Sequence, residues 1–297
     1  MPVIKNSVVT LGVFDGVHLA HQKIINKTVR EAKRLKVKSI IITFEKHPKK
    51  TTHKKAPLIL TTVTKKIELM KRLGVDLIVL IDFNRKFASK TAGSFIKDIL
   101  VKKLKVKEVV IGHDYGFGKG KEGNALLLKK AGKVNGFKTL VIPPVLINKR
   151  IVSSTRIRSA VLSGDIITAG KYLDREYSVI GRVEAGKKLG RTFGFPTANL
   201  NCFNEVVPKE GVYAVKIRMD GKQYKGACSI TSPTFDRPGS PTVNPEVFIF
   251  DFKKSIYNKI LEIYFVKRIR GSRKFKNAAL LVKQIKKDIA VIKKALK

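Results

Sequence analysis

A change of hydrophobic pattern near residue 175 constrains this 297-residue chain more than any other feature. Before it, short apolar runs alternate with longer amphipathic stretches, and after it apolar residues mostly recur at every second position. The first pattern is typical of strands and helices that alternate around a parallel sheet, and the second of an antiparallel barrel or sandwich. Because domains commonly hold ~100–200 residues, we predict two of them, 1–173 and 174–297.

The first domain is predicted to be an α/β, Rossmann-like fold whose parallel sheet has helices on both faces. Strands are expected at residues 8–13, 39–44, 76–81, 109–111 and 139–142. Helices are expected at residues 18–35, 64–73, 92–104, 125–135 and 156–162, with one more ending at 172. Ser153-Ser154-Thr155 and Ser163-Gly164-Asp165 contain residues that cap or stop helices, and they bracket 156–162. Ligands of such folds lie at the carboxyl ends of the strands, so motifs that follow strands are candidate sites.

The second domain is predicted to be a small antiparallel β-barrel with a C-terminal helix. Its strands are expected at residues 177–183, 212–217, 224–230, 246–252 and 261–265, separated by Gly, Pro and Asn. The chain then ends on an amphipathic helix. The apolar residues that share one face of this helix are Leu281, Ile285, Ile289, Ile292 and Leu296.

The charge is strongly unbalanced, with 62 Lys and Arg against 22 Asp and Glu, a formal net charge of +40. Such an excess can serve nucleic acid or small polyanions such as nucleotides. The lysines are spread along the whole chain and do not form one basic arm, which favours compositional drift for most of the charge. We therefore expect nucleic-acid binding to be weak and nonspecific at most.

Two cysteines, Cys202 and Cys228, lack the paired spacing of a metal site or a disulfide framework, which favours a reducing compartment. No segment reaches the ~20 apolar residues of a membrane span, and the N-terminus lacks the features of a signal peptide. These observations predict a cytoplasmic protein without membrane partners. They leave the oligomeric state open.

The segment Gly12-Val-Phe-Asp-Gly-Val-His-Leu-Ala-His21 follows one predicted strand and opens a helix. Gly12 and Gly16 allow a tight turn and close approach of a ligand. His18 and His21 share one face at the helix N-terminus, where unpaired N–H groups attract phosphate. A lone histidine pair is more often a simple cap, but the glycine-bracketed Phe-Asp-Gly before it favours a phosphate site.

A second segment, residues 181–199, combines glycines and basic residues before Pro-Thr-Ala-Asn. Such a loop can bend around polyphosphate, although the Walker A pattern is absent and a basic hairpin would have a similar composition. Thr197 and Asn199 lie two positions apart, hence on one side of an extended chain, where their oxygens can bind Mg²⁺.

Both segments resemble signatures of the prokaryotic bifunctional riboflavin kinase/FAD synthetases. The first is similar to G-x-F-D-G-x-H-x-G-H, with Ala20 in place of the glycine between the histidines, and the second to G-R-x-x-G-F-P-T-A-N. Further similar motifs follow in the family's order: F-x-x-H-P at 44–48, G-x-D-F-x-F-G at 112–118, S-S-T-R-I-R at 153–158, P-x-x-G-V-Y-A at 208–214, P-T-F at 233–235 and E-x-H-x-x-x-F at 246–252.

The resemblance implies a nucleotidyltransferase domain followed by a flavokinase barrel, and two reactions that use Mg-ATP: riboflavin to FMN, and FMN to FAD with release of diphosphate. It implies catalytic roles for His18, His21 and Arg156 in adenylylation and for Glu246 as the base of the kinase. It implies contacts to ATP or its phosphates from Gly12, Phe14, Asp15, Gly16, Ser154, Thr155, Arg158, Gly186, Lys187, Gly190 and Arg191. The implied flavin contacts are His47, Asp114, Phe117 and Arg270, and the implied Mg²⁺ ligands are Thr197 and Asn199.

Three departures from the family pattern leave alternatives open. Ala20 can weaken ATP binding, Phe248 replaces a histidine, and Ser272 replaces a glutamate in R-x-E-x-x-F. One alternative is therefore an adenylyltransferase with an impaired kinase domain. The other is a basic RNA-binding protein on an inherited enzyme fold, which would have no need of this set of catalytic residues.

Overall fold

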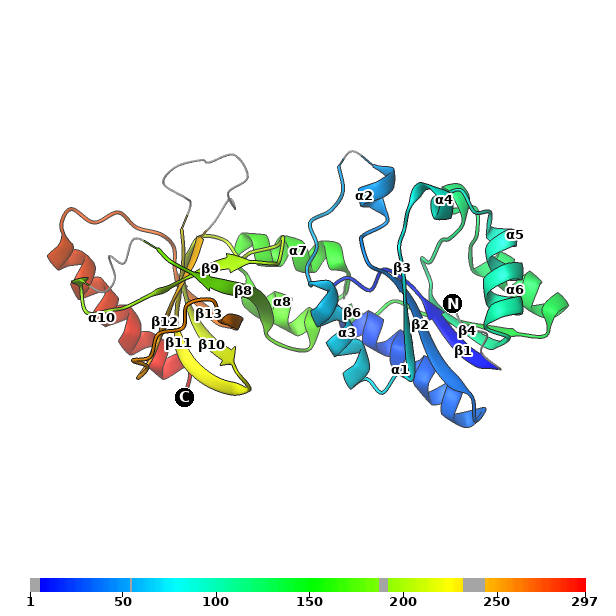
Figure 1. Ribbon diagram of the computed structural model, residues 1–297, viewed down its shortest axis with the longest axis horizontal. Coiled ribbons are helices and arrows are strands. Elements are labelled where there is room, and N and C mark those ends of the chain that lie inside the picture. Colours follow the sequence, from blue (N-terminus) through cyan, green and yellow to red (C-terminus); the bar gives the residue numbers. More distant parts are fainter. Residues whose placement is uncertain (1–5, 54, 187–191, 232–243) are drawn as a thin grey trace. The chain divides into compact units, whose positions relative to one another are not determined.

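A computed structural model describes residues 6–53, 55–186, 192–231 and 244–297. The chain divides into two compact units, Met1–Ser153 and Ser154–Lys297. Each unit has its own sheet, as Figure 1 shows. No helix in the described ranges is both long and apolar enough to cross a membrane.

The first unit is built on a five-stranded parallel sheet in the order β3-β2-β1-β4-β5. This confirms the predicted parallel α/β fold. Its strands are β1 (Ser7–Leu11), β2 (Lys38–Phe44), β3 (Leu77–Ile81), β4 (Val106–Gly112) and β5 (Lys138–Ile142). The helices that pack on the sheet are α1 (Leu19–Arg34), α3 (Val63–Arg72), α5 (Ala92–Phe95), η1 (Ile96–Lys103) and α6 (Ala125–Asn135).

Helices cover both faces of this sheet because successive strand residues point to opposite sides. Val8 of β1 packs in a cluster with α1 and α3, and the adjacent Val9 packs in a cluster with α5, η1 and α6. Both valines are completely buried. Figure 1 shows the two helical layers, with the blue α1 on one side of the sheet and α5 and α6 on the other.

Several shorter elements lie outside the sheet and were not expected from the pattern. The single helix predicted at 92–104 is divided into α5 and the wider π-helical turns of η1. The others are α2 (Lys49–Thr52), α4 (Arg85–Ala88), the 3₁₀ turn η2 (Lys119–Lys121) and the hairpin of β6 (Leu146–Ile147) and β7 (Arg150–Ile151).

The second unit is a closed, six-stranded antiparallel barrel in the order β10-β11-β12-β9-β8-β13, as predicted for its class. Its strands are β8 (Tyr177–Glu184), β9 (Ala198–Cys202), β10 (Gly211–Met219), β11 (Lys222–Thr231), β12 (Asn244–Ile249) and β13 (Ile260–Arg270). Large buried side chains fill it, among them Tyr213 and Phe265, whose rings meet edge to face at 5.3 Å.

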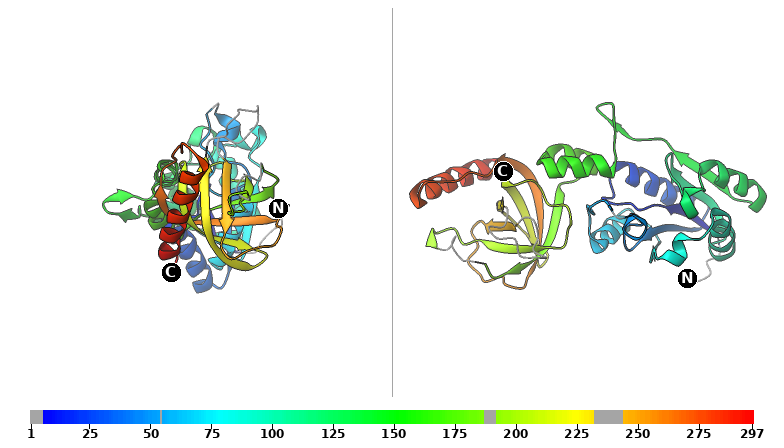
Figure 2. Two further views of the ribbon diagram at one scale, coloured as in Figure 1. Left: turned by 90° about the vertical axis from the view of Figure 1, so that its left-hand side faces the viewer. Right: turned by 90° about the horizontal axis from the view of Figure 1, so that it is seen from above.

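The terminal helix α10 (Ala278–Ala295) lies along the outside of the barrel, as Figure 2 shows. Ile292 is completely buried and Leu296 nearly so, against Ala214 and Phe250 on the outer face of the strands. The predicted apolar face of this helix is therefore the face that packs.

The helices α7 (Ser154–Ser163) and α8 (Ile166–Leu173) belong to the second compact unit. Asp165 ends the turn between them and caps α8, accepting a hydrogen bond from the Thr168 N–H at 3.0 Å. The compact units divide at Ser153, whereas the boundary predicted at residue 173 concerns the two catalytic domains and stays a prediction.

Candidate active sites

Three of the predicted motifs meet at one edge of the parallel sheet. The loop that begins at Gly12 follows β1, residues 44–48 follow β2, and residues 113–118 follow β4. Because β2, β1 and β4 are neighbours and parallel, these loops emerge side by side at the carboxyl end of the sheet. This is the edge at which ligands of parallel sheets bind.

The loop between β1 and α1 holds an unusual backbone. Phe14 and Val17 have positive φ angles of 52° and 40°, and Gly16 has 85°. Such angles are unfavourable for side chains with a Cβ, and most of all for the branched valine. A Cβ at Gly12 would lie 3.0 Å from the Phe14 ring, so glycine leaves the space that this ring uses. The surrounding fold therefore holds a tightly wound loop directly before the histidines.

His18 and His21 are brought together by the start of α1. His18 is the N-cap, and its Nδ1 accepts a hydrogen bond from the His21 N–H at 3.4 Å. The two rings stack with centroids 3.5 Å apart. Because Nδ1 of His18 is an acceptor, the proton of its neutral ring lies on Nε2, a donor suited to a phosphate oxygen. The predicted histidine pair is thus one compact unit at a helix N-terminus.

Asp15 is nearly buried, with 5% of its surface exposed, and its carboxylate faces the segment before α3. It accepts hydrogen bonds from the Leu60 N–H at 3.0 Å and the Thr61 N–H at 3.3 Å. The Gly16 N–H in turn donates to the Thr61 hydroxyl at 3.2 Å. A carboxylate repels phosphate, so this geometry favours a role in holding the loop. Its predicted ATP contact stays a prediction.

Lys66 is a residue that the sequence patterns did not single out. It lies on α3, yet its ammonium group donates to the Phe44 carbonyl at 2.6 Å, beside the Thr43 hydroxyl at 3.4 Å. Burial lowers the pKa of this lysine to about 8, against a partial rise from the charge of Asp15. In sequence it is one of many lysines, and only the packing of α3 places it at the sheet edge.

The flavin contacts predicted in this unit have different surroundings. The His47 ring accepts a hydrogen bond from the Lys49 N–H at 3.1 Å, within the turn that follows β2. The Asp114 side chain is 84% exposed. Phe117 is largely buried in the core, where its ring stacks on Tyr115 with centroids 5.8 Å apart. In this geometry Phe117 supports the loop by packing in the core. The flavin contacts of His47, Asp114 and Phe117 stay predictions.

The S-S-T-R-I-R motif spans the point where the two compact units divide. Ser153 closes the first unit, while Ser154, Thr155, Arg156 and Arg158 lie on the first turns of α7. Thr155 and Arg156 are exposed. Their predicted action together with the histidine pair stays a prediction.

The barrel brings together three predicted residues from distant parts of the chain. In the antiparallel pairing of β9 with β12, Glu246 lies directly opposite Asn199. The Thr197 hydroxyl donates to a Glu246 carboxylate oxygen at 3.2 Å. A carboxylate, a hydroxyl and an amide therefore share one small region, and their oxygens are of the kind that can bind Mg²⁺.

The glycine-rich loop approaches this cluster closely. A Cβ at Gly186 would lie only 1.9 Å from the Asn199 amide nitrogen, so any side chain there would displace the amide. Lys187, Gly190 and Arg191, the other predicted phosphate contacts of this loop, and the P-T-F motif at 233–235 lie outside the described residues.

A cavity of about 410 Å³ opens beside Thr197. One wall is formed by residues 196–198 and the other by residues 252–257, with Lys253 and Lys254 among them. Its size falls within the range of small-molecule sites. Sequence reasoning did not include 252–257, and the only signal there is the adjacent pair of lysines after β12.

Phe248, which replaces the family histidine, lies on the same face of β12 as Glu246, two positions further along the strand. Its ring lies edge to face with Phe195 at 5.8 Å and with Phe250 at 5.6 Å. Phe195 belongs to the G-F-P-T-A-N segment, so Phe248 supports the segment that carries Thr197 and Asn199. The replacement thus changes a packing partner of the site.

Arg270, predicted to contact flavin, holds α10 against the barrel. Its guanidinium donates to a carboxylate oxygen of Asp288 from Nε at 2.9 Å, and a second nitrogen lies 2.8 Å from the same oxygen. Gln284 donates to the other oxygen at 2.7 Å. Both charged side chains are largely buried, which makes this pair part of the structure. The predicted flavin contact stays a prediction.

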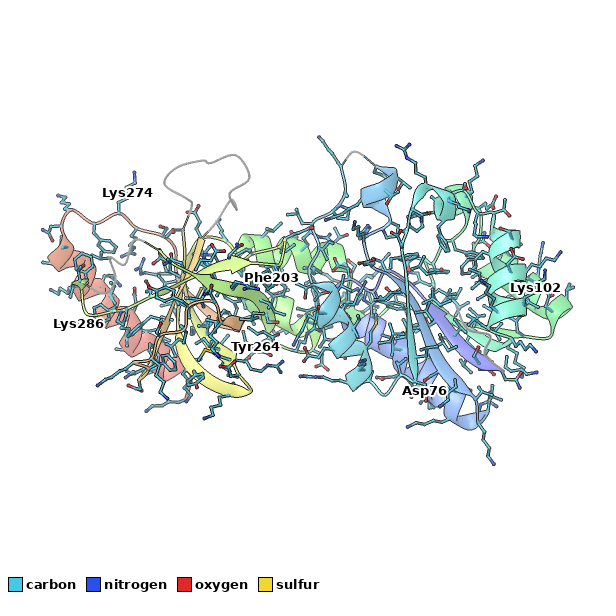
Figure 3. All side chains as sticks on the ribbon, in the orientation of Figure 1. Asp76, Lys102, Phe203, Tyr264, Lys274 and Lys286 are labelled. Carbon is cyan, nitrogen blue, oxygen red and sulfur yellow. The ribbon has the colours of Figure 1, made fainter. Side chains whose placement is uncertain are left out.

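The excess of lysine is distributed over both units. Lys102, Lys274 and Lys286 are exposed and lie on three different segments, as the labels in Figure 3 show. This distribution agrees with the spread of lysines along the sequence.

Comparison with known proteins identifies the two units. A family model described as FAD synthetase matches residues 2–156, and one described as riboflavin kinase matches residues 173–296. Curated relatives described as bifunctional riboflavin kinase/FMN adenylyltransferase match along nearly the whole chain. The relative from Buchnera aphidicola subsp. Schizaphis graminum is 38% identical over 97% of this chain and 94% of its own length. Those of Bacillus subtilis and Escherichia coli K12 are 37% and 35% identical, and each match covers 95% of this chain and 90% of the relative.

A solved structure from Streptococcus pneumoniae has a similar fold, with a TM-score of 0.90 and 34% identity over 99% of this chain and 95% of its own. That protein is described as a macrolide-efflux protein. Both family models and the curated relatives instead agree on flavin-directed activities. On these matches and on the two folds, the chain belongs to the bifunctional riboflavin kinase/FMN adenylyltransferase family.

Proposed function

We propose that this chain makes both flavin cofactors: it phosphorylates riboflavin to FMN with ATP, and it transfers AMP from a second ATP to FMN, giving FAD and diphosphate. The observation that carries the proposal is that each family model matches its own part of the chain, and each part retains the reactive residues. The histidine pair stands at the sheet edge of the first unit, and Thr197, Asn199 and Glu246 meet in the barrel.

In the kinase reaction, we assign Glu246 as the general base. The riboflavin 5′-oxygen attacks the γ-phosphorus of ATP, the bond to the bridging oxygen breaks, and ADP leaves. The proton of the hydroxyl passes to Glu246, which is half-buried in a region that also holds Thr197 and Asn199. Hydrogen bonding from Thr197 orients the carboxylate for this step.

The oxygen donors of Thr197 and Asn199 suit a Mg²⁺ ion that arrives with ATP, since Mg²⁺ prefers few protein oxygens together with substrate phosphates. When bound, the ion neutralises charge on the phosphates. Glu246 supplies the base for the riboflavin hydroxyl that receives the phosphate. Gly186 leaves room for the Asn199 amide.

In the adenylylation reaction, no strong base is needed because the attacking FMN phosphate is already an anion. A phosphate oxygen attacks the α-phosphorus of ATP, and the bond to the β-phosphate breaks. His18 and His21, stacked at the start of α1, are placed to donate hydrogen bonds to the phosphate as its charge increases. Catalysis then consists of positioning and charge stabilisation. The role of Arg156 in this step is proposed from the family motif alone.

We also propose a cytoplasmic location and only weak, nonspecific binding to nucleic acid. Both cysteines are free thiols, which suits a reducing compartment. Exposed lysines lie on both units, which suits general electrostatic attraction more than a built nucleic-acid groove.

The direct test is to incubate the purified protein with riboflavin, ATP and Mg²⁺ and to separate the flavins by chromatography. We expect both FMN and FAD. If no FMN forms, FMN is supplied directly. FAD made from it would leave an adenylyltransferase with an impaired kinase, and the absence of any product would contradict the proposal. The intact contact between Thr197 and Glu246 favours an active kinase.

A further inference from the structure

Lys66 occupies an uncommon position for a lysine. It lies on α3 with only 6% of its surface exposed. Its ammonium group reaches the carboxyl ends of two neighbouring strands, 2.6 Å from the carbonyl of Phe44 at the end of β2 and 3.5 Å from the carbonyl of Val13 beyond β1. Lys66 therefore links the two loops between which the sheet presents its ligand-binding edge.

The contacts of Lys66 form a small network around Val13. The Thr43 hydroxyl also donates to the Val13 carbonyl, at 3.1 Å, and lies 3.4 Å from the ammonium group. Val13 immediately precedes Phe14, the first residue of the left-handed turn that leads to His18. Lys66 is thus one of the groups that hold the backbone of that turn in place.

The charge of Lys66 is poorly compensated. In the described part of the chain, no carboxylate forms an ion pair with it, and its hydrogen-bond partners are neutral oxygens. The neighbouring Lys65 shows the contrast: it is equally buried, but it pairs with Glu68 at 3.3 Å. Burying an ammonium group without a counter-ion is costly, and the cost is reduced when an anion binds nearby.

The groups that face Lys66 limit which anion can compensate its charge. Asp15, from the loop before α1, is the charged group that partly raises the pKa of Lys66. Its carboxylate accepts hydrogen bonds from the N–H groups of Leu60 and Thr61. Thr43 and Phe44 contribute only a hydroxyl and a carbonyl. The Val13 carbonyl that Lys66 contacts at 3.5 Å precedes the turn that leads to the histidine pair, where phosphates are expected.

We infer that Lys66 is a positioning residue of the adenylylation site, which fixes the turn before His18 and supplies positive potential to the phosphates of ATP and FMN. This inference rests on the proposed adenylyltransferase function. Lys66 belongs to the first unit and the proposed kinase residues to the second. The riboflavin kinase of the same chain is therefore an internal reference for concentration, and circular dichroism reports whether the first unit is folded.

The test compares three variants, Lys66→Met, Lys66→Arg and the control Lys65→Met, by steady-state kinetics of FAD formation from FMN and of FMN formation from riboflavin. We expect Lys66→Met to lower kcat/KM for adenylylation by ~10²-fold, as for loss of a preorganised charged group. Lys66→Arg keeps the charge and is expected to stay within about tenfold of the parent chain. The control keeps Lys66 and is expected to have normal adenylylation, and all three are expected to have normal kinase activity.

A pH profile distinguishes an effect of the Lys66 charge on adenylylation from an effect of its packing alone. Burial lowers the pKa of Lys66 to about 8, so the ammonium form is present below pH 8 and is lost above it. In the parent chain kcat/KM for adenylylation, which reports the free enzyme, is expected to fall as the pH rises through 8. Lys66→Arg should remove this decline, because arginine stays charged. Lys66→Met should also show no decline, but its kcat/KM should be lower at every pH.

Two results would overturn the inference: normal adenylylation by Lys66→Met, or a decline above pH 8 that persists unchanged in Lys66→Arg. If the first unit of Lys66→Met does not fold, as circular dichroism would reveal, the profile of Lys66→Arg decides alone. A parent chain that makes no FAD from FMN would refute the proposed function itself, and with it the role of Lys66.

Discussion

The two candidate sites are assembled in different ways. In the first unit the histidines lie three positions apart, and one helix N-terminus brings their rings into a stack. In the barrel, Thr197 and Glu246 are 49 positions apart and meet because β9 pairs with β12. The first reactive pair is a local structure, whereas the second exists only when the barrel is closed in the correct register.

This difference has a physical consequence. A helix cap forms from a few adjacent residues, so the histidine pair depends on local backbone geometry. Side chains of a strand alternate between faces, so a slip of one residue between β9 and β12 would move Glu246 to the other face of the barrel. The kinase site is therefore the more sensitive of the two to changes in tertiary structure.

The largest effect is expected from Glu246→Gln, which removes the proposed base and keeps the shape of the side chain. Kinase activity should fall by ~10²–10⁴-fold, the usual contribution of a general base. FAD formation from supplied FMN should be unchanged, since Glu246 is not among the residues proposed for that reaction. Measuring both activities in one preparation checks this, and a kinase that remains active in Glu246→Gln would refute the assignment.

His21→Ala is the reciprocal change in the first unit. Adenylylation is expected to fall by ~10²–10³-fold through loss of one transition-state donor, with the kinase intact. His53→Ala is the matched control, because His53 is an exposed histidine of the same unit. Near-normal FAD synthesis by His21→Ala would remove the histidine pair from the mechanism.

Asp288→Asn tests whether the kinase unit depends on packing outside its site. The change removes the charge that pairs with the largely buried Arg270, and breaking such a pair costs about 3 kcal/mol of unfolding free energy. Urea unfolding followed by kinase activity measures this cost, with Lys286→Gln on the same helix as a control. If the stability is unchanged but riboflavin binding weakens, Arg270 acts on flavin as the sequence motif predicts.

The smallest effect is expected from Phe248→His, which restores the residue typical of the family. Phe248 lies beside Glu246 on the same face of β12, but its ring contacts are with Phe195 and Phe250, so we expect kinase kcat to change by less than about tenfold. Phe248→Leu separates loss of aromatic packing from gain of an imidazole. A much larger gain in the histidine variant alone would mean that this position takes part in the reaction.

Much of the fold was predictable because its hydrophobic pattern is strong. The helix α6 runs over the predicted residues 125–135, and the central strands β1, β2 and β4 are near-continuous apolar runs. The strand β9 was not among the predicted strands, although Ala198, Leu200 and Cys202 alternate with Asn199 and Asn201 as in a half-buried strand. Its alternation spans only five residues, and its pairing with β8 and β12 establishes it as part of the barrel. The predicted helix at 92–104 changes to π-helical turns after Phe95, which periodicity does not reveal.

By itself the sequence determined the two fold classes, the histidine pair and the family, because each rests on residues close together in the chain or on a repeated pattern. Only the tertiary structure decided that Glu246 faces Asn199, that Arg270 pairs with Asp288, and that Lys66 lies at the ligand edge of the sheet. These are contacts between segments distant in sequence. Residue type alone does not specify them, since a lysine on an amphipathic helix is exposed or buried according to what packs against that helix.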